Sequence, residues 1–358
     1  MARKDTMTSR ERFAAALSGK PYDRIPVFLL MSDYAARVIG VTVGEYQNSA
    51  ELMAKGQLAA WRLYGMDLIN TGPGLTGIAE AIGSKLAFPD NTAYVTDFPV
   101  STRGDLDRLQ IPNPFRDGRL PLFLEATQKV LDEVGASVPV SLTTAGPFTT
   151  AANIRGADQL LRDLRRDPGF VHRLLRFATD STIPFVREVF ALGARVSLAE
   201  PVASGTLISA KQFRAFALPY LNELIDAIKG FSGAAGPSLH ICGDSSKIWP
   251  EMADTGASIL SLDDVVDLAA ARAAVGDRVA LIGNIRPTAT MVLGTAADVR
   301  ANAKECFEKG AGNPKGYILG LGCALPINTP PENVHALVDA AWEFSAQYRP
   351  QLHRGGQA

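Results

Sequence analysis

Cysteine is scarce in this chain: its 358 residues include three, Cys242, Cys306 and Cys323. An odd and sparse set argues against a secreted scaffold held together by disulfides and favours a reducing compartment. The first residues, Met1 to Asp5, carry charges that no apolar stretch follows. We therefore expect no secretory leader and predict a cytoplasmic protein.

Long apolar runs and clusters of basic residues are missing as well. No apolar run reaches the ~18 residues that a membrane-spanning helix needs. The formal net charge is −1, and the lysines and arginines do not gather into a basic run. The composition therefore predicts neither a membrane protein nor a partner of nucleic acids.

Short apolar runs are abundant instead, and they alternate with segments of helical periodicity. The eight runs are residues 25–30, 66–71, 138–144, 195–199, 238–242, 258–262, 279–284 and 317–323. Such alternation is typical of a parallel sheet. It predicts an α/β protein, a (β/α)8 TIM barrel whose active-site groups lie at the C-terminal ends of the strands. We expect a single domain over residues 1–358, with a core of about 22–345 and a capped N-terminal helix at 8–18.

The stretch from about residue 73 to 114 interrupts this alternation after the second predicted strand. Within it, Pro89-Asp90-Asn91 separates two runs of alternating polarity. Turn residues between two such runs indicate a β-hairpin. The predicted hairpin is either a wall of a substrate pocket or a surface decoration.

The most informative stretch is Ser238 to Asp244, which contains His240 and Cys242. Residues i and i+2 of a strand point to the same face, so this imidazole and this thiol converge. Cys323 follows Gly-Leu-Gly at the end of the eighth predicted strand. One histidine and two cysteines are a set of protein ligands known from catalytic zinc sites. We therefore predict a metal site, whereas Cys306, in a helical segment, is expected to be structural.

Other polar residues follow the predicted strands at the same end of the barrel. Glu200 follows the fourth strand and is interpreted as a fourth metal ligand, a substrate-orienting group or a structural carboxylate. Asp263 and Asp264 follow the sixth strand, where one is expected to face the pocket and the other to cap a turn. Asn284 ends the seventh strand and offers an amide beside the site.

The sequence resembles the uroporphyrinogen decarboxylase superfamily in short motifs that run from about residue 8 to 345. The motifs are Arg10-Glu11-Arg12-Phe13, Asp23-Arg24-Ile25-Pro26-Val27, Tyr64-Gly65-Met66-Asp67, Ile208-Ser209, Pro219-Tyr220, His240-Ile241-Cys242-Gly243, Gly283-Asn284, Gly322-Cys323 and Thr329-Pro330-Pro331-Glu332-Asn333. Within this superfamily, His-x-Cys with a late Gly-Cys is similar to the zinc- and corrinoid-dependent methyltransferase branch, typified by methylcobamide:coenzyme M methyltransferases. The decarboxylase branch has an arginine-containing motif after its first strand, whereas residues 31–36 here read Met-Ser-Asp-Tyr-Ala-Ala.

The resemblance implies a barrel that binds zinc through His240, Cys242 and Cys323. It also implies pocket roles for Glu200, Asp263 and Asn284. A corrinoid (methylcobalamin), free or carried by a partner protein that docks at the C-terminal face of the barrel, is the implied cofactor. The implied activity is methyl transfer between the corrinoid and a thiol, folate or methoxy compound.

Three other functions remain open at this point. An O-demethylase component would take the methyl group of an aryl ether, for which Phe28, Tyr34, Phe88, Tyr94 and Phe148 either line a pocket or belong to the core. A tetrapyrrole lyase would need arginines at the barrel mouth, where Arg24, Arg37 and Arg155 are the candidates. A non-catalytic corrinoid-binding protein would have a structural zinc site, closed by a fourth ligand such as Glu200.

Overall fold

Eight parallel strands form one curved sheet in the computed structural model, which describes residues 5–89, 93–233 and 235–352. The strand order is β1-β10-β9-β8-β7-β6-β5-β2. The strands are β1 (Val27–Phe28), β2 (Ile69–Gly74), β5 (Val140–Ala145), β6 (Arg195–Ala199), β7 (Ser238–Ile241), β8 (Ile259–Leu262), β9 (Ala280–Ile285) and β10 (Tyr317–Leu321). Each lies within or beside one of the eight predicted apolar runs, so the prediction of a (β/α)8 barrel is confirmed.

The strands are apolar because the barrel buries both of their faces. Every residue of β9 and of β10 is buried, as expected for a parallel sheet covered by helices. Strands β1 and β2 are the two ends of the sheet order, and they meet at Asp67. The backbone N–H of Asp67 donates to the carbonyl of Val27 at 2.8 Å, and the N–H of Val27 donates to the Asp67 carboxylate at 2.8 Å. These two hydrogen bonds close the barrel.

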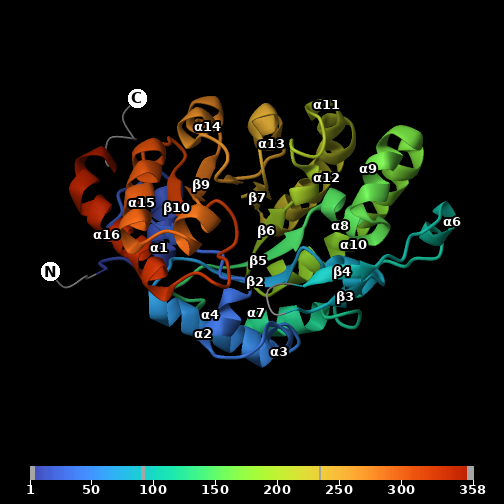
Figure 1. The fold of residues 1–358 in the computed structure, drawn as a ribbon, viewed down its shortest axis with the longest axis horizontal. Helices are drawn as coiled ribbons and strands as arrows, with labels where there is room; N and C mark the ends of the chain where they lie inside the picture. The colour runs from blue at the N-terminus through green and yellow to red at the C-terminus, as the bar shows by residue number, and fades with distance from the viewer. Residues whose placement is uncertain (1–4, 90–92, 234, 353–358) are drawn as a thin grey trace.

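Helices surround the sheet (Figure 1). The α-helices outside the barrel mouth are α1 (Ser9–Leu17), α4 (Ala50–Tyr64), α7 (Leu120–Val134), α9 (Ala157–Arg166), α10 (Pro168–Ala191), α12 (Leu218–Ser232), α13 (Trp249–Asp254), α14 (Leu268–Val275), α15 (Ala296–Gly310) and α16 (Pro331–Leu352). Further helices lie in the loops that follow the strands: α2 (Tyr34–Val38), α3 (Val43–Gln47), α5 (Gly77–Ile82), α6 (Arg103–Leu106), α8 (Pro147–Arg155) and α11 (Ala210–Gln212). Within the described ranges, no helix has the length and apolar character required to cross a bilayer.

The predicted hairpin is present after the second barrel strand. Strands β3 (Lys85–Ala87) and β4 (Tyr94–Asp97) pair antiparallel, with Leu86 opposite Val95. The predicted turn at residues 90–92 lies outside the described residues. Ala93, which precedes β4, lines a cavity of about 250 Å³ that also borders His240, so this part of the hairpin contributes to a pocket wall.

The N-terminal helix α1 is tied to the barrel through buried charges. Thr8 caps the helix in a reciprocal pair with Glu11, which confirms the predicted capped helix. Arg12 of this helix and Arg24 both donate to the Asp67 carboxylate, each with a contact of 2.6 Å. All three side chains are almost completely buried. Asp67 therefore bridges two buried guanidinium groups at the point where the barrel closes, and Asp5 and Asp23 supply further negative charge.

Replacing Asp67 by Asn is expected to destabilise the fold strongly, since it leaves two buried guanidinium groups without their shared carboxylate. Losing one partner of a buried ion pair costs about 3–5 kcal/mol. The free energy of unfolding from urea titrations measures this loss. The matched control is Asp132→Asn on the exposed face of α7, where we expect a change below about 0.5 kcal/mol. Equal stabilities of the two variants would contradict the role given to Asp67.

Candidate metal centre

His240 and Cys242 come from strand β7 and the residue that follows it. The buried side chains along β7 are Leu239 and Ile241, which point away from the face that carries His240. The parallel partner β8 aligns Ser261 with His240. The alternation of the strand thus places the imidazole and the thiol on one face, as predicted.

Cys323 reaches the same place from the end of β10. The backbone N–H of Gly322 donates to the carbonyl of Ile285 at 2.8 Å, which holds the chain beside β9 just before Cys323. A Cβ atom on Gly322 would lie 2.5 Å from the backbone nitrogen of Asp264. Glycine is therefore required for this close approach of the two loops.

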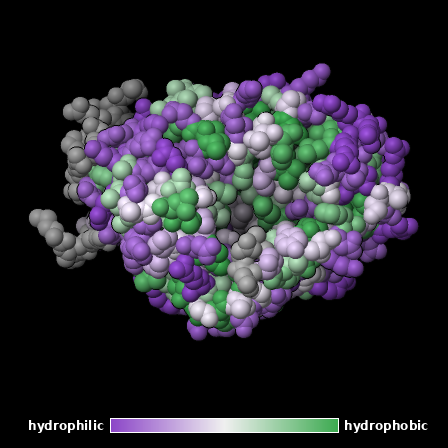
Figure 2. All heavy atoms as spheres, in the orientation of Figure 1, coloured by the Kyte–Doolittle hydropathy of each residue, from purple (hydrophilic) through white to green (hydrophobic). Residues whose placement is uncertain are grey.

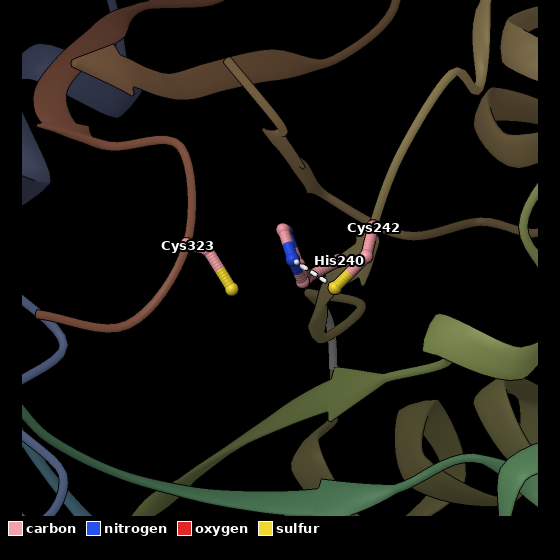
Figure 3. A group of neighbouring side chains, drawn as sticks. All are labelled: His240, Cys242 and Cys323. Atoms are coloured by element: carbon pink, nitrogen blue, oxygen red, sulfur yellow. Dashed lines mark hydrogen bonds between the residues drawn. The ribbon is translucent and has the colours of Figure 1, made fainter. Parts of the chain in front are cut away.

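The three ligand atoms converge on one point (Figure 3). His240 Nε2, Cys242 Sγ and Cys323 Sγ all lie within 4.8 Å of one another. The Nε2 and Sγ atoms of His240 and Cys242 are 3.1 Å apart. On the other side of the ring, His240 Nδ1 lies 3.0 Å from the carbonyl oxygen of Ser261 and donates to it. This hydrogen bond selects the tautomer whose Nε2 lone pair faces the two sulfur atoms.

The electrostatics of the two thiols favour a shared negative charge. The Cys242 thiol donates to the Cys323 sulfur and, together with His240, lowers the pKa of Cys323 to about 4. The same hydrogen bond, added to burial, raises the pKa of the Cys242 thiol well above its ordinary value. The thiolate is the form of cysteine that binds metals, so one of the two ligands is already in its binding form.

No fourth metal-binding side chain joins the cluster in the described part of the chain. All three residues border a cavity of about 250 Å³. Its wall also includes Ser32, Asp33, Tyr46, Gln47 and Gln57, from the segment that follows β1. Three protein ligands beside a cavity are typical of a catalytic metal site, in which the fourth position is left for substrate or water.

Glu200 is close in the fold but does not join the cluster. Its carboxylate is completely buried and accepts hydrogen bonds from the backbone N–H groups of Phe148 and Thr149, at 3.1 and 2.5 Å. These two groups belong to the first turn of α8, where the helix dipole also favours an acceptor. Burial raises the pKa of Glu200 to about 7, and the hydrogen bonds oppose this rise only in part.

Asp263 and Asn284 likewise bind backbone groups next to the centre. Asp263 accepts from the N–H of Gly243 at 2.7 Å, directly after Cys242 in the chain. Asn284 donates to the carbonyls of Asp263 and Val266, at 3.0 and 2.8 Å. Like Glu200, neither side chain lines the cavity. The prediction that these three residues act in catalysis remains a prediction.

The residues that line the cavity from the segment after β1 were not predicted from the sequence. Gln57 lies in the middle of α4, and Tyr46 and Gln47 lie in α3. A glutamine in an amphipathic sequence carries no signal that distinguishes a pocket wall from a solvated face. Its low exposure, which could have drawn attention to it, appears only in the folded structure.

The arginines considered for a tetrapyrrole site form ion pairs or hydrogen bonds with other parts of the protein. Arg24 is buried against Asp67, and Arg155 pairs with Asp163 at 2.9 Å. Arg37 donates to the backbone carbonyls of residues 327 and 329. None of them lines the cavity. Of the five aromatic residues considered for an aryl ether pocket, Phe28 borders a smaller hollow of about 50 Å³ together with His240 and Cys323, and the other four line neither space.

Comparisons with known proteins identify the family of the chain. Residues 8–344 match the family described as Uroporphyrinogen decarboxylase (URO-D). The methylcobamide:CoM methyltransferase MtaA of Methanosarcina barkeri is 30% identical over 347 residues, covering 95% of this chain and 99% of that protein. A uroporphyrinogen decarboxylase of Psychromonas ingrahamii is 26% identical over 360 residues, covering 96% and 99%. The solved structure of a methyltransferase from Methanosarcina mazei superposes with a TM-score of 0.85 at 30% identity, covering 94% and 99%.

The metal centre predicts that two of the three cysteines are needed for metal binding. Cys242→Ser and Cys323→Ser are expected to bind zinc at least about tenfold more weakly, because each loses a thiolate ligand. Cys306→Ser is the matched control, since this buried cysteine lies on α15 outside the cluster. Elemental analysis after dialysis, with circular dichroism to verify folding, measures the effect. Wild-type zinc content in both cluster variants would remove the assignment.

Glu200 predicts a pH dependence of stability. Its pKa rises from an ordinary 4.5 to about 7 on folding, so the folded metal-free protein holds this proton more tightly than the unfolded chain. Protonated Glu200 therefore contributes its full share to the free energy of unfolding below pH 4.5. As the pH rises through 7 this share is lost, which lowers the free energy of unfolding by up to about 3 kcal/mol. In urea titrations from pH 4.5 to 8, the free energy of unfolding should fall less with pH for Glu200→Gln than for the wild type. Glu125→Gln, at an exposed position, should show the wild-type dependence of the free energy of unfolding on pH. The same dependence in all three proteins would contradict the raised pKa of Glu200.

Proposed function

The chain belongs to the uroporphyrinogen decarboxylase family, and from this premise we propose that it is a zinc-dependent methyltransferase. It moves a methyl group between a corrinoid and a small substrate. The observation that supports this proposal is the convergence of His240, Cys242 and Cys323 beside a cavity. The activities named for the methyltransferase relatives support the corrinoid as the second reactant.

The donor set fits zinc on chemical grounds. Zinc prefers four tetrahedral ligands among imidazole nitrogen and thiolate sulfur, and its catalytic sites keep one position for a reactant. When the His240 ring is neutral, Nε2 is the nitrogen free to bind a metal, because Nδ1 donates to the carbonyl of Ser261. The two cysteines would neutralise a divalent cation. A bound zinc ion would lower the pKa of a substrate thiol and keep it in the thiolate form.

The protein residues then position the reactants. Asp263 holds the N–H of Gly243 and so fixes the loop that carries Cys242. The substrate thiolate would attack the methyl carbon of the methylated corrinoid. A sulfur–carbon bond would form and the carbon–cobalt bond would break, with its electron pair left on the corrinoid. The contributions of the chain are alignment and exclusion of water.

The loops at the barrel mouth offer a surface for the corrinoid or its carrier protein. The large apolar side chains of these segments include Leu75, Tyr94, Leu207, Val265 and Leu293, which are 40–77% exposed. They follow strands β2, β6, β8 and β9, and the C-terminal ends of parallel strands share one face of the barrel. Figure 2 shows apolar residues around the hollow near the centre of this view. Exposed apolar groups gathered on one face favour a partner with an apolar surface.

The same centre could catalyse methyl transfer in the opposite direction, from a methyl ether to the reduced corrinoid. We place this O-demethylase reaction second, because only one of the five aromatic side chains considered for an aryl pocket, Phe28, borders the candidate centre. A lyase acting on a tetrapyrrole is disfavoured by the absence of arginine from the described cavity wall. A closed structural zinc site is disfavoured because the Glu200 oxygens accept backbone hydrogen bonds.

The proposed activity is tested by anaerobic demethylation of methylcobalamin. Zinc-loaded protein with a thiol is expected to convert methylcobalamin to cob(I)alamin, measured by its absorbance. Cys323→Ser should lose at least about 100-fold in rate, because a site without its metal no longer activates the thiol. Cys306→Ser should keep the wild-type rate.

Other outcomes separate the alternatives. Methyl transfer from a methoxyarene to cob(I)alamin, with thiols and tetrahydrofolate inactive as acceptors, would favour the O-demethylase. Full activity in protein stripped of zinc would overturn the proposal.

A further inference from the structure

A second cavity lies at the opposite end of the barrel from the metal centre, and we call it the N-terminal cavity. It has a volume of about 630 Å³. The first residues of four neighbouring strands border it, namely Arg195 of β6, Ser238 of β7, Ile259 of β8 and Ala280 of β9. Ligand pockets usually have volumes of about 300–1,000 Å³, so this space is large enough to hold a small molecule.

Serine side chains leave this end of the barrel hollow. The cavity is bordered by Ser141, Ser197, Ser238 and Ser258, whereas barrel interiors are usually filled by bulky branched side chains. The hydroxyl of Ser238 donates to that of Ser197 at 2.8 Å, and the hydroxyl of Ser258 donates to the carbonyl of Gly236 at 2.6 Å. These three hydroxyls are thus paired within the protein and do not require a polar ligand.

Apolar side chains form much of the remaining wall. One apolar cluster contributes five residues that border the cavity: Phe13, Leu68, Ile259, Ala280 and Ile282. Phe190 and Phe231 border it as well, and Phe231 is 39% exposed. Apolar surface of this kind binds hydrocarbon groups, because contact removes both partners from water.

Basic side chains from four separate segments also border the cavity. They are Arg10 of α1, Arg195 of β6, Arg278 before β9 and Lys315 before β10. No aspartate or glutamate is among the described residues of this wall. A cavity lined by charges of one sign raises the local concentration of ions of the opposite sign.

Two of these four cations have no partner in the described part of the chain. Arg278 pairs with Asp254, and the Arg10 guanidinium donates to the backbone carbonyl of residue 135. The side chains of Arg195 and Lys315 form no hydrogen bond or ion pair with a described residue. Both side chains are exposed at the edge of the cavity and are therefore available to an anionic group.

We propose that the N-terminal cavity binds an amphipathic anion, a carboxylate or phosphate attached to an aliphatic chain. The headgroup binds to Arg195 and Lys315, and the chain lies against the apolar wall. An ammonium on the same chain would be repelled by the four cations. None of the metal ligands borders this cavity, so the inference does not depend on the proposed function.

Five ligands that differ in charge or in chain length provide the test. Octanoate and octyl phosphate carry an anionic headgroup, octanol a neutral one and octylammonium a positive one, while acetate lacks the chain. Titration calorimetry on zinc-loaded protein measures their dissociation constants. We expect at least one eight-carbon anion to bind at least about tenfold more tightly than octanol, the effect of a hydrogen bond to a charged group. Acetate should bind at least about 100-fold more weakly than octanoate, because it buries no chain.

Variants link this preference to the wall. Arg195→Gln combined with Lys315→Gln should weaken binding of the eight-carbon anion at least about tenfold and leave octanol binding unchanged. Phe231→Ser should weaken the anion and octanol by the same factor. The matched control combines Lys55→Gln and Arg162→Gln, at exposed positions of the outer helices α4 and α9, and should bind all five ligands as the wild type does.

Several results would overturn the inference. They are binding of octylammonium as tightly as octanoate, binding of acetate as tightly as octanoate, wild-type anion affinity in the Arg195 and Lys315 double variant, or no binding of either eight-carbon anion. Methyl transfer is measured separately on the same protein. Its absence would overturn the proposed function without affecting this site, and both double variants should retain the wild-type zinc content and rate of methylcobalamin demethylation.

Discussion

Closure of the sheet is the constraint on which the metal centre depends. His240 and Cys242 come from β7 and Cys323 follows β10, with β8 and β9 between them. In a flat sheet, strands three places apart are separated by roughly 14 Å. In the closed barrel the ligand atoms lie within 4.8 Å of one another. The contact between Asp67 and Val27 that joins the two ends of the sheet is therefore also a condition for the site.

Buried polar side chains then hold the loops that carry or surround the ligands. Glu200 after β6 binds the first turn of α8, and Asp263 after β8 binds the backbone beside Cys242. Asn284 of β9 binds two carbonyls in the loop after β8. Each side chain satisfies backbone groups that a loop would otherwise leave exposed or unpaired. Together they connect successive strands at the barrel mouth, which limits the relative movement of the ligands.

The sequence predicted the parts of this structure that depend on local periodicity. Eight apolar runs predicted eight strands, and the two-residue spacing of His240 and Cys242 predicted a shared face. The partners of Glu200 and Asp263 could not be predicted, since both carboxylates bind backbone N–H groups, which every residue but proline offers. Gln57 was missed for a related reason: a polar residue on a helix looks the same in sequence whether it faces solvent or a cavity.

The cavity wall explains how one barrel can serve different chemistry within a family. The relatives include proteins named as decarboxylases and proteins named as methyltransferases, so the fold alone does not select the reaction. A tetrapyrrole with several carboxylates needs cations around it, because a buried carboxylate without a partner is costly. Here Arg24, Arg155, Arg119 and Arg37 are bound to Asp67, Asp163, Glu80 and backbone carbonyls. None of these four arginines lines the cavity, whose described wall presents two thiols and an imidazole together with the carboxylate of Asp33.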